Sequence, residues 1–247
     1  MRQQACDSRC GTHRGPPNVS EGRVRSAEVR VIAEESAPDE LIPAGPKCTR
    51  TVRERGPIIT TLTSVLSDPH VKRLIVVAGP DLPDAFCAAV IGRLMLMERL
   101  DVEVALVLPF ATPASGVYGL PTGSAAAVLA TEGSAAEVPL IRDDMAIVLL
   151  GAARQRGIDG DLDGESYVDS TLLFRGKAKA VIVEPIAEMP GVRARLDKRF
   201  RSRWHAGRAA QTGATQLIVE RDGITAPRPT KRSTFYRNQQ NWHLVRP

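Results

Sequence analysis

The sequence predicts an α/β fold in which a parallel-sheet half is followed by a β-rich antiparallel half, with a disordered N-terminal tail. Two near-continuous apolar runs, 73–78 and 102–108, have the length of buried parallel strands and flank a segment with helical spacing. Aromatic residues make up only 4% of a chain that is 43% hydrophobic, so we expect a core of Val, Leu, Ile and Ala. Past Gly151, short segments alternate with turns that contain Gly and Asp, which favours antiparallel strands.

In the first half, a helix is expected from about Pro57, because apolar residues recur there at helical spacing: Ile58, Ile59, Leu62, Val65 and Leu66. After the strand at 73–78, Asp81 and Asp84 mark the start of a second helix, whose apolar face carries Phe86, Val90, Ile91, Leu94 and Met97. With the strand at 102–108, these elements predict a right-handed βαβ crossover.

The rest of the first half is predicted to be more irregular. We expect a flexible loop at 109–119, then a short helix over 125–131 that Ser124 caps and Gly133 ends. Two strands are then predicted at 138–141 and 145–150.

The second half carries hairpin signals. Strands are expected within 165–174 and 179–185, and Asp222-Gly223 predicts a tight turn between 216–220 and a strand that begins at Ile224. A last hairpin is expected from 233–236 and 242–245. Between these β segments, four large residues recur every fourth position and predict a basic amphipathic helix packed on the sheet: Val192, Leu196, Phe200 and Trp204.

The N-terminal residues 1–56 are predicted to be a disordered tail, because they contain one short apolar island among Arg, Pro, Gly, Ser and acids. Domains are accordingly expected at 57–151 and 152–247. Cys6, Cys10 and His13 have a hint of zinc-ligand spacing, with Cys48 as a fourth ligand, but a second tight ligand pair is missing. A tail without metal is therefore the favoured interpretation.

Charge and cysteine content limit the compartment and the partners. The four cysteines form no secreted disulfide framework, and no signal peptide or spanning segment is evident, so a cytoplasmic protein with at most peripheral membrane contact is expected. The net charge is +5, but residues 191–247 hold thirteen Lys and Arg against three acids. A solvated basic face explains this better than nucleic-acid binding, since aromatic platforms are few. A homo-oligomer stays open.

Two small-residue turns are placed where a phosphate-binding fold needs them. One, with Gly79 and Asp81, follows the apolar strand at 73–78, and the other, Pro121-Thr122-Gly123-Ser124, opens a helix. Turns without large side chains let backbone N–H groups approach an anion, and a helix N-terminus adds partial positive charge. The two turns therefore predict a nucleotide phosphate site.

These turns and their order resemble the diacylglycerol kinase catalytic family, whose architecture is shared with sphingosine kinases and more distantly with NAD kinases. The first turn is similar to the family's Gly-Gly-Asp-Gly-Thr loop through Gly79 and Asp81. The second is similar to its Pro-x-Gly-Thr-x-Asn-Asp motif, and Asp222-Gly223 to its Asp-Gly-Glu turn. The resemblance covers about 73–247. It implies ATP and Mg²⁺ as cofactors, a lipid hydroxyl as acceptor, and catalytic roles for Asp81 and Asp222.

The chain departs from the family at several polar positions. Pro80 removes an N–H donor, and Leu82 stands where the family has a glycine that permits close phosphate approach. Ala126-Ala127 replaces the Asn-Asp pair, and Ile224 replaces the glutamate.

Carboxylates able to hold Mg²⁺ are few. Asp143 and Asp144 are adjacent on a predicted loop, and carboxylate oxygens suit that cation. A plain turn at 142–144 is the alternative, as an N-cap is for Asp81.

Three functions stay open. The first is an ATP-dependent lipid kinase, and the second is a catalytically inactive descendant that binds a nucleotide or a protein. The third is a polyanion binder that uses the basic C-terminal segment.

Overall fold

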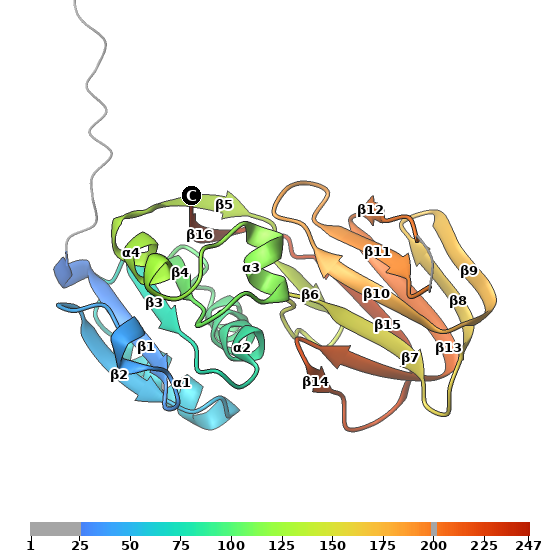
Figure 1. Cartoon of the computed structure of the whole chain (residues 1–247), viewed down its shortest axis with the longest axis horizontal. Helices are drawn as coiled ribbons and strands as arrows, with labels where there is room; N and C mark the ends of the chain where they lie inside the picture. The colour runs from blue at the N-terminus through green and yellow to red at the C-terminus, as the bar shows by residue number, and fades with distance from the viewer. Residues whose placement is uncertain (1–25, 199–201) are drawn as a thin grey trace, which may run out of the picture.

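The computed structural model describes residues 26–198 and 202–247 of the 247-residue chain and places them in two lobes, each built on one sheet (Figure 1). The first lobe contains the α-helices, and the second is made of strands. The predicted combination of a parallel and an antiparallel sheet is confirmed.

The first sheet has six strands in the order β2-β1-β3-β4-β16-β5, and every neighbouring pair except β16 and β5 is parallel. Its strands are β1 (Val29–Glu34), β2 (Lys47–Thr51), β3 (Arg73–Val77), β4 (Glu103–Val107), β5 (Ser134–Val138) and β16 (Trp242–Arg246). All residues of β3 are buried, as a central strand covered on both faces requires.

Helices cover both faces of this sheet. The described helical elements are η1 (Ser26–Glu28), η2 (Asp39–Leu41), α1 (Arg55–Leu66), α2 (Pro83–Leu96), α3 (Pro113–Tyr118) and α4 (Ser124–Glu132). Alternate residues of β3 point to opposite faces, so Leu74 and Val76 pack in a core with α1, α2 and α3. Ile75 and Val77 pack in a second core with α4 and η2.

The expected disorder of residues 1–56 is wrong from residue 26 onward. The apolar island there becomes β1, which pairs with β2 on one side and β3 on the other. Its burial comes from residues distant in sequence, which a local estimate of packing against chain entropy does not include. Cys6, Cys10 and His13 lie outside the described residues, and Cys48 is exposed in β2.

The link from β4 to α4 also differs from expectation. The expected loop at 109–119 contains α3, whose N-cap Thr112 accepts a hydrogen bond from Ser115 N at 3.1 Å. Helix α4 begins at Ser124, so Gly123, with a φ of 63°, is its N-cap. Ser124 is therefore not the cap that we expected.

The second sheet is antiparallel throughout. Its strands are β6 (Ile141–Asp143), β7 (Ala153–Gly157), β8 (Leu162–Val168), β9 (Thr171–Ala178), β10 (Ala180–Pro185), β11 (Val192–Leu196), β12 (His205–Gly207), β13 (Ala209–Arg221), β14 (Ile224–Thr225) and β15 (Thr230–Arg237). The long strand β13 pairs with β7, β8, β14 and β15. The predicted Asp-Gly hairpin is confirmed, because Arg221 pairs with Ile224 and both turn residues have positive φ.

The strands predicted at 138–141 and 145–150 are shifted. Strand β5 ends at Val138 and β6 covers Ile141–Asp143, while 144–147 form a turn and Val148 makes a single bridge to Arg142. Buried Asp143 closes this turn by accepting hydrogen bonds from Met145 N and Ile147 N.

The predicted basic helix around Val192 and Leu196 is wrong, because these residues form strand β11 with alternating burial. A spacing of four residues is compatible with a helix and also with one face of a strand, since four is an even number. Trp204 packs under the guanidinium groups of Arg193 and Arg195, each about 4.5–4.6 Å from the ring centre. Phe200 lies outside the described residues.

The expected last hairpin is also wrong. Strand β15 stays in the second sheet, whereas β16 crosses back and inserts between β4 and β5 of the first (Figure 1). This return places Trp242 in the first core, where its ring meets Tyr118 edge-on at 5.7 Å. The first sheet is thus completed by the C-terminal residues, and the limits 57–151 and 152–247 stay a prediction.

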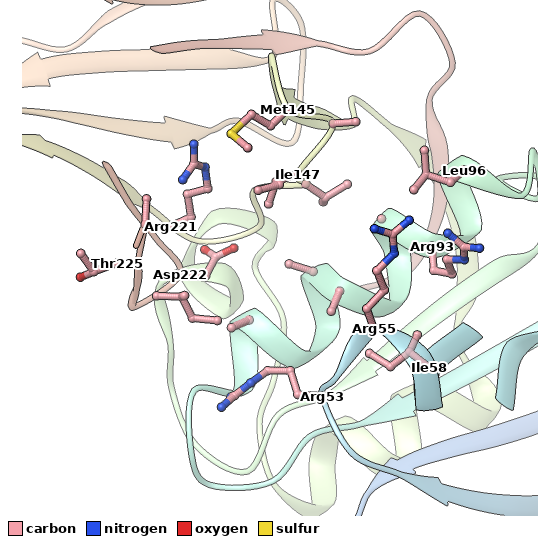
Figure 2. Close-up of a pocket in the computed structure, with 18 of the residues that line it drawn as sticks. Arg53, Arg55, Ile58, Arg93, Leu96, Met145, Ile147, Arg221, Asp222 and Thr225 are labelled. Carbon is pink, nitrogen blue, oxygen red and sulfur yellow. The ribbon is translucent and has the colours of Figure 1, made fainter. Parts of the chain in front are cut away.

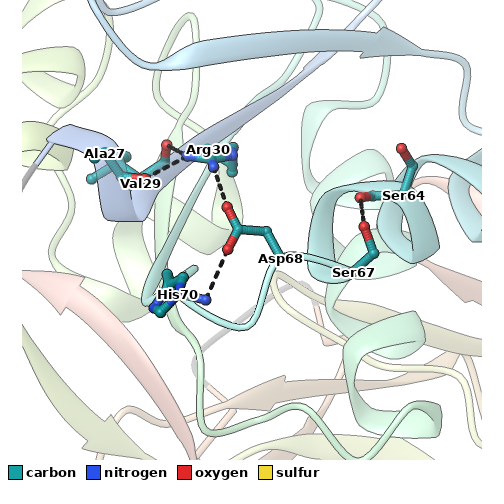
Figure 3. Close-up of polar contacts among 7 residues, drawn as sticks. All are labelled: Ala27, Val29, Arg30, Ser64, Ser67, Asp68 and His70. Atoms are coloured by element: carbon teal, nitrogen blue, oxygen red, sulfur yellow. Dashed lines mark hydrogen bonds and ion pairs between the residues drawn. The ribbon is translucent and has the colours of Figure 1, made fainter.

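A polar cluster fixes the link between α1 and β3 (Figure 3). Asp68 pairs with Arg30 of β1 at 2.5 Å and accepts a hydrogen bond from His70 N at 3.0 Å. The link is therefore tied to the start of β1.

Among the described helices, none has both the length and the apolarity to cross a bilayer.

Candidate functional site

Both predicted phosphate turns lie at the carboxyl edge of the first sheet. Gly79 follows β3, and Gly123 N donates a hydrogen bond to Leu108 O, just past β4, at 2.8 Å. Because β3 and β4 are parallel neighbours, the structure brings the two turns to the same edge. Pro121, Thr122 and Gly123 are partly exposed there and Ser124 is exposed.

The first turn is filled by side chains of its own lobe. Gly79 N donates a hydrogen bond of 2.8 Å to Glu34 Oε2, and Glu34 is buried at the end of β1. A Cβ atom at position 79 would lie 2.9 Å from that carboxylate oxygen and would collide with Ser36 Oγ. Gly79 is therefore needed for close approach, but the group that approaches is a carboxylate of this chain.

The Glu34 carboxyl is held in a mixed electrostatic environment. Burial raises its pKa, and the Gly79 N–H and the charge of Arg53 act in the opposite direction. Asp81 and Glu54 raise the pKa further. The turn is thus surrounded by acids, which disfavour a second anion at the same place.

A hollow of about 520 Å³ opens next to this turn and has an acidic lining. Glu34, Glu35 and Glu54 contribute to it, and Arg53 is the one cation among its lining residues. The space that the resemblance assigns to nucleotide phosphates is therefore net negative in charge.

Asp81 lies at the rim of this region. Its side chain is 80% exposed and pairs with Arg53 at 3.5 Å. It does not cap α2, because the N-cap is Leu82, with a left-handed φ of 52°. Asp81 keeps the catalytic role only as a prediction.

Asp222 occupies a different environment, deep between the lobes. Its carboxylate accepts hydrogen bonds from three successive backbone donors: Leu150 N at 3.1 Å, Gly151 N at 2.7 Å and Ala152 N at 3.2 Å. Burial raises the pKa of Asp222 to about 7, the three donors lower it, and Asp84 raises it. These three hydrogen bonds hold residues 150–152, the segment that leads into β7, against the Asp222 carboxylate.

Asp84 is a buried acid that the sequence analysis treated only as a helix start. Its Oδ2 accepts a hydrogen bond from Ala114 N at 3.0 Å, whereas its buried Oδ1 has no hydrogen-bond partner among the described residues. Burial raises its pKa. A Cβ at Gly151 would lie 2.6 Å from Asp84 Oδ2 and 3.0 Å from Asp222 Oδ1, so the two acids flank this glycine.

Asp143 and Asp144 do not form the expected cation site. Asp143 is completely buried, and its Oδ2 forms an ion pair of 2.6 Å with Arg221, while Asp144 is exposed. Within the described ranges, no three His, Cys, Asp or Glu side chains are grouped so that they could hold a metal ion. A carboxylate neutralised by a buried guanidinium is a poor ligand for Mg²⁺, so these residues do not fit that ion.

A larger hollow, of about 620 Å³, runs along α2 and ends at the β13–β14 turn (Figure 2). We call it the α2 groove. Helix α2 forms one wall, the 145–148 turn another, and Asp222, Ile224 and Thr225 close one end. Four arginines also line it: Arg53, Arg55, Arg93 and Arg221. Sequence reasoning missed the groove because its walls come from both lobes.

Comparison with known proteins supports the fold. No protein-family model matches the chain, and no curated protein matches its sequence. A crystal structure of a diacylglycerol kinase from Bacillus anthracis str. Sterne superposes with a TM-score of 0.68 at 14% identity, over 89% of this chain and 97% of that one. An NAD kinase from Archaeoglobus fulgidus, solved in complex with ATP, gives 0.55 at 9% identity over 88% and 93%. The resemblance drawn from the two turns is thus confirmed at the level of the fold.

Proposed function

We propose that this chain is a binding protein built on the lipid-kinase-like fold and that it does not transfer the γ-phosphate of ATP. The observation that carries the proposal is the 2.8 Å hydrogen bond from Gly79 N to Glu34 Oε2. The backbone donor that the resemblance assigns to a nucleotide phosphate is occupied by an internal carboxylate, which takes the place of the anion.

Two further features support the same function. A triphosphate in the adjoining hollow would meet Glu34, Glu35 and Glu54, and like charges at that range are repulsive. Asp222 accepts hydrogen bonds from three backbone donors, and Ile224, which stands where the family has a glutamate, has no ionisable group. Asp222 is thus the one ionisable group among residues 222–224, and its carboxyl is already held by the backbone of 150–152.

The second candidate is the ATP-dependent lipid kinase. One observation favours it: the second turn keeps its form, with Gly123 at positive φ and an exposed Ser124 at the start of α4. In this case Asp81 would accept the proton of the lipid hydroxyl, and ligands other than Asp143 would hold the Mg²⁺. We rank it second because Glu34 occupies the first turn.

Calorimetric titration of MgATP into the full chain tests the proposal. We expect no measurable binding by the wild type up to millimolar nucleotide. Glu34→Gln keeps the shape of the side chain and removes its charge, so it should strengthen MgATP binding by about tenfold or more, since a relieved charge contact of ~1.4 kcal/mol has that effect. Glu188→Gln, an exposed acid between β10 and β11, is the matched control and should behave as the wild type.

Phosphate transfer is measured in parallel with a diacylglycerol in mixed micelles. Micromolar MgATP binding by the wild type, together with transfer of phosphate to the lipid, would overturn the proposal in favour of the kinase.

A further inference from the structure

The α2 groove gathers apolar side chains that the fold itself leaves exposed. The described residues include nine large hydrophobics with high exposure, and four of them line this one groove: Leu96, Met145, Ile147 and Ile224. Their exposed fractions are 56%, 72%, 41% and 44%. Concentrated apolar exposure in a hollow is typical of a ligand or partner site.

The groove is also basic, and two of its four arginines have no hydrogen-bond or ion-pair partner among the described residues. Arg53 bonds to Asp81, and Arg221 to Asp143. For the side chains of Arg55 and Arg93, the described residues offer no hydrogen-bond or ion-pair partner. In addition, Arg93 Nε is buried without an acceptor. Arg55 is exposed and Arg93 is partly buried, so both guanidinium groups are free to bind an anion that enters this end of the groove.

Figure 2 shows how the two kinds of side chain are arranged. The guanidinium groups of Arg55 and Arg93 lie at the end of the groove near Leu96, while Asp222 and Thr225 lie at the opposite end. The apolar residues of α2 and the 145–148 turn occupy the length between them. A ligand that matches this pattern has an anionic head at one end and an apolar body.

We propose that the α2 groove binds a single-chain lipid with a phosphate monoester head, the phosphate between Arg55 and Arg93 and the chain along α2. A phosphate monoester carries about −1.5 to −2 charges near neutral pH, which balances two guanidinium groups better than one carboxylate does. The volume of about 620 Å³ is in the range of sites for one small ligand. This inference rests on the proposed binding function and names its ligand class.

Binding of oleoyl lysophosphatidate below its micelle concentration is the test, measured by calorimetry with the full chain. Three probes separate the contributions: monooleoylglycerol for the chain alone, glycerol 3-phosphate for the head alone, and oleate for a carboxylate head. We expect lysophosphatidate to bind about tenfold or more tightly than each of them.

Variants connect this affinity to the groove. The double variant Arg55→Gln/Arg93→Gln should reduce lysophosphatidate binding to that of monooleoylglycerol, whereas Arg232→Gln, an exposed cation on β15, should leave it unchanged. A Cβ at Gly92 would meet only Val148, at 3.6 Å, so Gly92→Leu is expected to fold and to block both lipids by filling the groove. Thermal unfolding of each variant shows that it is folded.

Equal affinity for the neutral and the phosphorylated lipid would overturn the proposal. So would oleate binding at least as tight as lysophosphatidate, or an unchanged double variant. The MgATP assay is independent of these results. Phosphate transfer by the wild type contradicts the proposed function, whereas no transfer and no lysophosphatidate binding contradicts only the ligand class.

Discussion

Asp222 is the residue whose protonation should be visible in the stability of the protein. Its pKa is about 7 in the folded protein against an ordinary 3.8, so between these values the folded state binds the proton and the unfolded state does not. The free energy of unfolding should therefore fall as pH rises from about 4 to 7. The difference between the two pKa values corresponds to a change in the free energy of unfolding on the order of 4 kcal/mol at most.

Asp222→Asn removes this titration. We expect the variant to lose most of the decrease in unfolding free energy between pH 4 and 7, measured by urea denaturation at several pH values. Asp81→Asn, which changes an exposed acid, should keep the wild-type slope. Identical slopes for wild type and Asp222→Asn would contradict the burial of a titrating carboxyl at this turn.

The site residues differ in how far their structural roles could be predicted from the sequence. Asp222 could be predicted, because Asp-Gly between apolar segments marks a tight turn by its backbone requirement alone. Glu34 could not, since its role depends on β1 pairing beside β3, and its surroundings predicted a disordered tail. Asp84 was visible only as a helix start, because its burial comes from the packing of α3 against α2.

At the scale of elements, β16 makes a testable contribution. Trp242 of β16 is fully buried in the core of the first lobe, where its ring contacts Tyr118. Trp242→Ala should lower the free energy of unfolding by about 3–5 kcal/mol, because it leaves a large cavity. Trp242→Phe keeps a ring and should cost clearly less. Chemical denaturation measures both, and a cost below about 1 kcal/mol for Trp242→Ala would show that β16 does not complete the first sheet.

The elements that sequence predicted well are those with an unambiguous period. Strand β3 and helix α2 were predicted because the strand is apolar from Leu74 to Val77 and the helix carries large apolar residues at helical spacing. Strand β11 was not, because a repeat of four residues fits both a helix and a strand. The partner of β16 was also not predictable, since antiparallel pairing with the preceding strand and return to another sheet have the same local pattern.

At the scale of the whole molecule, the two lobes meet where two acids, Asp84 and Asp222, flank Gly151. The chain passes from the first sheet to the second after β5 and returns before β16, so the second lobe is one continuous segment, whereas the first lobe is built from two. Sequence predicted the order of a parallel and an antiparallel half, because composition and turn residues change near Gly151. The α2 groove and the interlobe contacts could not be predicted, since they need the relative placement of α2, the 145–148 turn and the β13–β14 hairpin.

Gly151 provides a test of this junction. An added Cβ would lie 2.6 Å from Asp84 Oδ2, 2.9 Å from Pro113 Cβ and 3.0 Å from Asp222 Oδ1, so the two lobes would have to move apart. Gly151→Ala should lower the free energy of unfolding by about 1–3 kcal/mol, as overpacking does. It should also make the 145–152 segment more accessible to protease. Gly116→Ala in α3, where nothing lies within 4 Å, is the matched control and should be neutral or slightly stabilising in a helix. If both variants unfold alike and resist protease alike, the lobes are not held together at Gly151, and the α2 groove would lack the fixed wall that its proposed ligand requires.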